Sequence, residues 1–214
     1  MSELEPPIIL GSTSPRRRQI FQLLGLPHET ANPDVDEKAI PYATPRDLAL
    51  KAALTKSIAL LETAAPGQIV ITADTVVGLD GIVFNKPVDD DDAVDMLIRL
   101  SGRTHQVITG IAVAQKEGAS MVHAEESRVT FRNLSKEEIL RYVATGIPRD
   151  KAGAYGIQDQ SFQVVESIEG DYFNVVGLPV NCLWSLLGEF IDLAPYAASR
   201  RELTREKFQS ALEN

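Results

Sequence analysis

The residues best suited to bind an anion follow a short apolar run near the N-terminus. Ile8-Ile9-Leu10 leads into Gly11-Ser12-Thr13-Ser14-Pro15 and then Arg16-Arg17-Arg18. Free amides at a helix N-terminus, two hydroxyls and neighbouring guanidinium groups together favour phosphate. The spacing is not that of a Walker loop. On its own, the segment fits a phosphate site and a capped surface helix with solvated arginines equally well.

Carboxylates form the second group of candidates. Asp74 and Thr75 follow residues 69–73, an apolar run that we expect to form a buried strand ending there. A carboxylate at such a strand end could hold a divalent cation or take a proton from water. Glu37 and its acidic neighbours could ligate the same cation, because carboxylates near a phosphate need one. Taken singly, a turn aspartate and a solvated acidic loop are the more common interpretations.

Two lysines and an amide complete the set. Lys51 in a predicted helix and Lys86 in Asn85-Lys86-Pro87 could carry positive charge toward a phosphate, although each also reads as an ordinary surface lysine. The glycine-rich stretch 150–158 ends in Gln158. Its amide both donates and accepts, which matches the adjacent N–H and C=O of uracil or thymine. A simple glycine-rich turn is the competing interpretation.

Strands and helices mix along the whole chain, which predicts one α/β domain with a mixed sheet. We expect this domain to span residues 1–192 and to be followed by a helical extension, 193–214, of unknown role. The sequence predicts strands at 8–10, 69–73, 107–114, 121–131 and 162–168, a hairpin over 76–84, and helices at 15–24, 45–61, 89–100, 135–145, 178–187 and 199–212.

Composition narrows the class of protein. The 214 residues include 44% hydrophobic side chains, enough for a real core, and carry a formal net charge of −9. That charge argues against a duplex-binding protein but not against one small anionic ligand. The single cysteine excludes an internal disulfide. We find no signal peptide and no run long enough to span a membrane, so we expect a cytoplasmic protein.

Taken together and in this order, the segments resemble the Maf family of nucleotide pyrophosphatases. The likeness covers about residues 8 to 188, and many weak motifs in register make it specific. It is carried by Ser12-Thr13-Ser14-Pro15-Arg16-Arg17, Ala73-Asp74-Thr75-Val76-Val77, Lys86-Pro87, Leu100-Ser101-Gly102-Arg103 with His105, Thr109-Gly110, and the segments 151–158 and 170–179.

The resemblance implies an elongated mixed β-sheet flanked by helices with a central cleft, similar to inosine triphosphate pyrophosphatases. It implies hydrolysis between the α- and β-phosphates of a nucleotide, with a divalent metal cation, magnesium or manganese. The family's proton acceptor falls on Asp74, and Glu37 joins it as a metal ligand. The specificity positions fall on Arg16, Thr75 and Gln158, and the phosphate-binding positions on Ser12, Arg16, Arg17, Lys51 and Lys86.

The loop ending in Gln158 resembles the branch that acts on dTTP and UTP, whereas a sister branch acting on 7-methyl-GTP has a different loop. Modified pyrimidine nucleotides fit the sequence equally well. The alternative from another class is a non-catalytic nucleotide-binding regulator of cell division. The expected partner is a small-molecule nucleotide, with no nucleic acid and no membrane, and the family suggests a homodimer.

Overall fold

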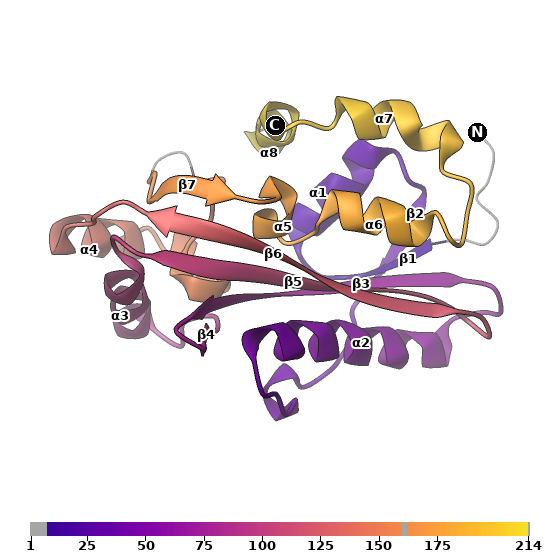
Figure 1. Ribbon diagram of the computed structural model, residues 1–214, viewed down its shortest axis with the longest axis horizontal. Helices are drawn as coiled ribbons and strands as arrows, with labels where there is room; N and C mark the ends of the chain where they lie inside the picture. The colour runs from indigo at the N-terminus through magenta and orange to yellow at the C-terminus, as the bar shows by residue number, and fades with distance from the viewer. Residues whose placement is uncertain (1–7, 160–161, 214) are drawn as a thin grey trace.

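A mixed sheet runs through the length of the computed structural model, which describes residues 8–159 and 162–213; the acidic segment 1–7 lies outside it. Within these residues the strand order is β2-β1-β3-β5-β6-β7, and β4 also pairs with β3 (Figure 1). The mixed sheet expected from the sequence is therefore confirmed. The strands are β1 (Ile8–Gly11), β2 (His28–Ala31), β3 (Ile69–Leu79), β4 (Ile82–Phe84), β5 (Thr104–Gln115), β6 (Ser120–Phe131) and β7 (Val165–Glu169).

Helices cover both faces of the sheet. In Figure 1, α2 lies alone beneath the sheet, α1 and α5 to α8 lie above it, and α3 and α4 close one end. The helices are α1 (Pro15–Leu24), α2 (Pro45–Thr63), α3 (Asp90–Leu100), α4 (Lys136–Ala144), α5 (Tyr172–Val176), α6 (Val180–Leu187), α7 (Ala197–Glu202) and α8 (Arg205–Glu213), with short 3-10 turns η1 (Glu37–Ala39), η2 (Ile147–Asp150), η3 (Ala152–Ala154) and η4 (Ala194–Tyr196).

The central strand, β3, departs from the sequence prediction. We expected a strand that ended at Asp74, but β3 continues through it to Leu79. The polar pair Asp74-Thr75 interrupts the apolar pattern locally, whereas antiparallel pairing with β5 runs without a break across it. Asp74 is therefore a mid-strand residue, and its backbone is fixed by a long-range ladder and not by a turn.

Alternation along β3 divides the core between the two faces of the sheet. Ile69, Ile71 and Ala73 pack with α1 and α6. Val70 and Val76 belong to the apolar clusters under α2. Because neighbouring strand residues point to opposite faces, any two consecutive polar residues on β3 must serve different sides of the sheet.

The C-terminal segment folds differently from the single helix that we predicted over 199–212. It forms α7 and α8, separated by Leu203, which is buried in the same cluster as α1. Thr204 accepts a hydrogen bond from the backbone N–H of Lys207, in the manner of a helix N-cap, so Ser199 does not start the last helix. Phe208 is fully buried, so this tail is packed into the main core.

Close backbone contact between α2 and the sheet depends on Gly110 of β5, which lies opposite Asp74. A Cβ atom at this position would lie 2.0 Å from the carbonyl oxygen of Ala49 in α2. Backbone cannot yield as a flexible side chain can, so only glycine lets α2 sit this low on the sheet. The height of α2 in turn sets how far its side chains reach toward β3.

We predict that Gly110→Ala lowers the free energy of unfolding by about 3 kcal/mol, because α2 must lift from β5. Urea denaturation of the purified variants measures this. Gly118→Ala is the control, because the three atoms nearest to its Cβ belong to the side chain of Gln115 and none to backbone, and we expect a loss of at most about 1 kcal/mol. Equal losses in the two variants would contradict the contact.

Candidate active site

The candidate site lies where β3 loses its neighbour along one edge. On that edge β1 pairs with β3 as far as Gly11 opposite Thr72, and β4 begins to pair only at Val77 opposite Phe84. Residues 73–76 therefore have no strand beside them on that edge among the described residues. The opposite edge is fully occupied by β5. This leaves a gap beside four residues of β3, and side chains from both faces of the sheet can reach into it.

The two predicted anion-binding segments converge on this gap. β1 runs parallel to β3, so the loop after Gly11 reaches the gap from one side. β4 runs antiparallel, so the segment after Phe84, which carries Lys86, reaches it from the other side. Ser14 is the N-cap residue of α1, although its side chain does not cap the helix, and Ser12 is buried with its hydroxyl accepting from the N–H of Ser14 at 3.2 Å.

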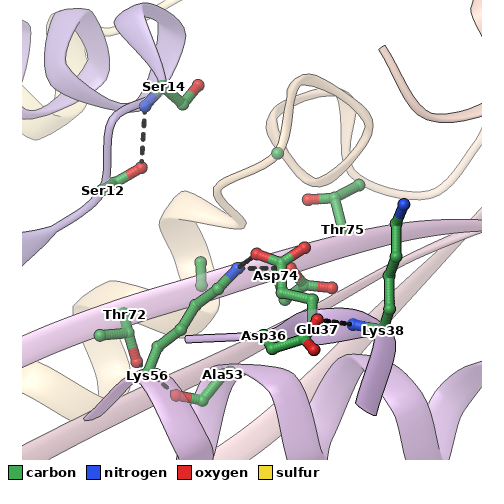
Figure 2. Close-up of polar contacts among 12 residues, drawn as sticks. Ser12, Ser14, Asp36, Glu37, Lys38, Ala53, Lys56, Thr72, Asp74 and Thr75 are labelled. Carbon is green, nitrogen blue, oxygen red and sulfur yellow. Dashed lines mark hydrogen bonds and ion pairs between the residues drawn. The ribbon is translucent and has the colours of Figure 1, made fainter. Parts of the chain in front are cut away.

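An ion cluster lies on the α2 side of the gap. The ammonium of Lys56 lies 2.6 Å from Asp74 Oδ1 and 2.5 Å from Glu37 Oε1. Figure 2 shows the three side chains converging from α2, β3 and η1. Lys56 and Asp74 are 9% and 13% exposed, whereas Glu37 is 52% exposed and therefore open to solvent. Lys56 offsets the cost of burying the charge of Asp74 and also attracts the more exposed carboxylate of Glu37.

The position of Glu37 is set by a short local turn. The side chain of Asp36 accepts a hydrogen bond from the N–H of Lys38 at 3.1 Å and caps η1 (Figure 2). Partial burial alone would raise the pKa of Glu37. The charge and hydrogen bond of Lys56, with the charges of Lys86 and Arg17, outweigh that effect and hold the pKa of this carboxyl below its ordinary value. Glu37 is thus a stable anion facing a cationic cluster.

Arg17 joins the other side of the gap to the rest of the fold. Its guanidinium donates to the carbonyl of Ala73 at 2.9 Å, to that of Gly177 at 2.7 Å, and to the hydroxyl of Thr75 at 3.0 Å. The bond to Ala73 takes up a backbone acceptor on the open edge of β3. Burial lowers the pKa of Arg17 and the charge of Asp74 opposes this, but a guanidinium remains charged in either case.

Thr75 points away from Asp74, as alternation requires. Its hydroxyl also lies 2.9 Å from that of Thr109, which donates to the carbonyl of Asn174. Asn174 is fully buried, and its amide donates to Val107 and Ser127. A buried polar network therefore holds Thr75 and, through it, Arg17. This arrangement makes Thr75 a support for the arginine as well as a predicted specificity position.

The remaining predicted cations lie in different surroundings. Arg16 Nη1 is 3.8 Å from Asp150 in η2, which precedes the glycine-rich loop. Lys86 is exposed, yet its charge lowers the pKa of Glu37. Lys51 instead bonds to Asp47, in the first turn of α2, and to the carbonyl of Pro41, which precedes the helix. The structure thus places Lys56, five residues further along, against the carboxylates, and places Lys51 elsewhere.

Gln158 lies on the loop that packs against the end of the β3–β4 pair. In that loop Gly153 sits against Val77, and its N–H donates to the carbonyl of Asn85 at 3.2 Å. Tyr155 is buried, and its hydroxyl lies 2.8 Å from Nε2 of His105. Burial lowers the pKa of His105 to about 4, so this partner is neutral at physiological pH. The loop is therefore fixed to the same region of β3 that forms the gap.

Asp74 and Glu37 are the acidic side chains at the gap that could hold a divalent cation. No group of three or more His, Cys, Asp or Glu side chains suited to a metal ion occurs in the described part of the chain. Asp74 and Glu37 nevertheless direct carboxylate oxygens at one common point, the ammonium of Lys56. Magnesium is often held by one or two carboxylates, with substrate phosphates and water completing its shell. Two convergent carboxylates fit that pattern.

Comparison with known families decides the relationship. A family model described as Maf-like protein matches residues 7–190. The chain belongs to the Maf-like family. The matched region includes every predicted site residue and stops before the tail that forms η4, α7 and α8.

Relatives within the Maf-like family align over most of the chain. A dTTP/UTP pyrophosphatase of Symbiobacterium thermophilum is 46% identical over 183 residues, which cover 86% of this chain and 93% of that protein. A dTTP/UTP pyrophosphatase of Bacillus cereus strain B4264 is 42% identical over 183 residues, 86% of this chain and 95% of that protein. Among solved structures, the Ham1 protein of Staphylococcus aureus has a TM-score of 0.48 at 16% identity, covering 86% of this chain and 98% of that chain.

In the residues that the structure describes, none of the helices combines the length and the apolar character needed to cross a membrane.

We predict that Lys56→Gln raises the pKa of Glu37. Burial of Glu37 raises this pKa, and the substitution removes the charge of Lys56, which is the largest effect that lowers it. Carbon-13 NMR titration of the glutamate carboxyls measures this directly. In the wild type the pKa of Glu37 is depressed, so its contribution to stability is present above its ordinary value of 4.5 and is lost as the pH falls below it.

The matched control is Lys51→Gln, which removes the same charge from the same helix. Because Lys51 bonds to Asp47 and Pro41, this substitution should leave the titration of Glu37 unchanged. A larger shift in the Lys51 variant than in the Lys56 variant would refute the assignment of Lys56 to the cluster.

Proposed function

We propose that this chain hydrolyses dTTP and UTP to the monophosphate and pyrophosphate, as a nucleoside triphosphate pyrophosphatase. The observation that carries the proposal is the gap in β3, where Asp74 is paired with Lys56 and two candidate anion-binding segments converge. Relatives at 42–46% identity over most of the chain, named dTTP/UTP pyrophosphatases, support the same reaction and substrates.

The triphosphate would lie along the loop after β1 and the segment after β4. Ser12 and the amides at the start of α1 offer hydrogen bonds, while Arg16 and Lys86 offer charge. Arg17 adds a fixed guanidinium at the edge of β3. Of the two lysines on α2, Lys56 is the better placed for this role, because Lys51 is engaged at the first turns of its helix.

In the proposed reaction Asp74 orients a water molecule and accepts its proton. The water oxygen forms a bond to the α-phosphorus, and the bond from that phosphorus to the bridging oxygen breaks. Pyrophosphate leaves with the electron pair, and the cationic side chains hold its charge. Positioning and charge stabilisation supply most of the acceleration in such transfers.

Asp74 and Glu37 are the residues that would hold a magnesium or manganese ion. When bound, such an ion neutralises charge on the phosphates and offsets their repulsion from the two carboxylates. Lys56 keeps the carboxylates paired and close together when no other cation is present. The same two acidic side chains thus serve a chemical and an electrostatic role.

We predict that Asp74→Asn lowers kcat by about 10²- to 10⁴-fold, because the amide keeps the shape and loses the proton acceptor. The assay supplies each common ribo- and deoxyribonucleoside triphosphate, 5-methyl-UTP and pseudo-UTP with magnesium or manganese, and measures pyrophosphate and orthophosphate separately. Pyrophosphate from dTTP and UTP is the expected product, and added chelator should abolish it.

Other products would overturn the proposal in identifiable ways. Orthophosphate in place of pyrophosphate would place the cleavage at the γ-phosphate and reject the mechanism. Binding of nucleotides with no product would favour a non-catalytic regulator. A much higher kcat/KM for the modified pyrimidines than for dTTP and UTP would retain the reaction and change the substrate.

We predict that Gln158→Ala reduces the preference for UTP over CTP by about tenfold or more in kcat/KM. UTP and CTP share ring size and differ at the edge that a side-chain amide can read, so the comparison isolates that contact. Arg16 and Thr75 are the other proposed specificity residues. An unchanged UTP to CTP ratio in the Gln158 variant would remove this residue from base selection.

A further inference from the structure

Gln158 occupies a tight turn whose two ends are held together. The N–H of Asp159 donates to the carbonyl of Gly156 at 3.2 Å, so Ile157 and Gln158 are the two central residues of a four-residue turn. Four-residue turns at a surface are commonly adaptable. A residue that must read one edge of a base requires a fixed backbone, so the constraint on this turn matters.

That constraint comes from a side chain on another element. The hydroxyl of Tyr142, in α4, accepts a hydrogen bond from the N–H of Gly156 at 3.2 Å and donates one to Asp159 Oδ2 at 2.5 Å. One oxygen atom thus joins the first and last residues of the turn that carries Gln158. The two bonds use the hydroxyl both as acceptor and as donor, which is its full directional capacity toward the turn.

The Tyr142 ring has little freedom to move. It is fully buried, and it stacks on Phe162 with ring centroids 4.9 Å apart and an interplanar angle of 17°. Burial and the Asp159 carboxylate both raise the pKa of Tyr142, so the hydroxyl keeps its proton and remains a donor. A rigid ring that carries a protonated hydroxyl is a fixed point against which the turn is held.

The turn has a sequence feature that this contact requires. A Cβ atom at Gly156 would lie 2.7 Å from Asp159 Oδ2 and 2.8 Å from Cε of Lys151. Any larger residue would therefore push the carboxylate of Asp159 away from the hydroxyl. Gly156 permits Asp159 to fold back over the turn, and that close approach brings both ends within reach of one side chain.

We propose that Tyr142 is a positioning residue for base selection, which acts by holding both ends of the turn that presents Gln158. This inference rests on the proposed function, in which Gln158 reads the base. Tyr142 itself touches neither nucleotide nor water in the reaction. It fixes where the Gln158 amide points, so its loss should weaken discrimination between bases more than it slows the chemical step.

The test is Tyr142→Phe, which keeps the buried ring and removes only the hydroxyl. We expect the ratio of kcat/KM for UTP to that for CTP to fall about tenfold, through a higher KM for UTP, while kcat for UTP stays within about threefold. Amide hydrogen exchange in the peptide containing residues 156–159 should become faster. An unchanged ratio and KM for UTP, with only a loss of stability, would reduce Tyr142 to a core residue.

The matched control is Tyr155→Phe. It removes one buried hydroxyl from the same loop, but the bond lost there runs to His105 and not across the turn. We expect it to retain the UTP to CTP ratio. If Tyr155→Phe relaxes the ratio as much as Tyr142→Phe does, general loosening of the loop explains the result and the inference fails.

Asp159 supplies an independent arm. Asp159→Asn keeps an oxygen acceptor for the tyrosine hydroxyl and should retain the ratio, whereas Asp159→Ala should lose it as Tyr142→Phe does. The double variant that combines Tyr142→Phe with Asp159→Ala should have a UTP to CTP ratio no lower than that of the poorer single variant, because both substitutions remove the same hydrogen bond. Simple addition of the two losses would contradict a shared contact.

Failure of the proposed function looks different from failure of this inference. A wild-type chain that does not turn over UTP rejects the proposed function. A Gln158→Ala variant with unchanged preference removes Gln158 from base selection, and the positioning role of Tyr142 falls with it, while the reaction itself stands. Relaxed preference in Gln158→Ala together with retained preference in Tyr142→Phe rejects the positioning role alone.

Discussion

The structure depends on one interruption in a hydrogen-bonded ladder. β3 is paired along one edge by β5, yet on its other edge β1 ends opposite Thr72 and β4 ends opposite Val77. A strand with an open edge exposes backbone donors and acceptors, and the side chain of Arg17 takes the carbonyl of Ala73 there. Because β1 and β4 both run toward the gap, the segments that follow these two strands begin beside it.

Because side chains alternate along β3, the polar residues at the gap point to opposite faces of the sheet. Asp74 faces α2, where Lys56 pairs it with Glu37, whereas Thr75 faces α1 and supports Arg17. In a continuous sheet these two faces would be separated by neighbouring strands. At the gap they share one opening, so the carboxylate of Asp74 and the fixed guanidinium of Arg17 both lie beside it. The chain can carry a net charge of −9 and still present local positive charge to a phosphate.

Local sequence patterns predicted the helix ends that depend on interactions between residues close in sequence. The helices predicted at 15–24 and 135–145 both form, as α1 and α4: Gly25 ends α1 in a left-handed conformation, and Ser135 and Glu138 make both hydrogen bonds of a capping box at the start of α4. Asp74 was recognised as important but assigned to a strand end, because the pairing that carries β3 onward comes from β5, some 35 residues later. Lys56 was missed for a similar reason. The sequence does not distinguish the two lysines of α2, because only the packing of this helix against β3 determines which of them faces a carboxylate.

The C-terminal tail and the Gln158 loop are two further features that local sequence patterns do not determine. We predicted one amphipathic helix over 199–212, whereas Leu203 and Phe208 are both buried beside α1 and the chain is broken between α7 and α8. Tyr142 is one aromatic residue in an amphipathic helix, a pattern that indicates core packing and nothing more. Its hydroxyl acquires a directed role only because the chain returns to it some fourteen residues later with Gly156 and Asp159. A residue that positions a site through a non-local turn leaves no periodic signal, so structure is needed to find it.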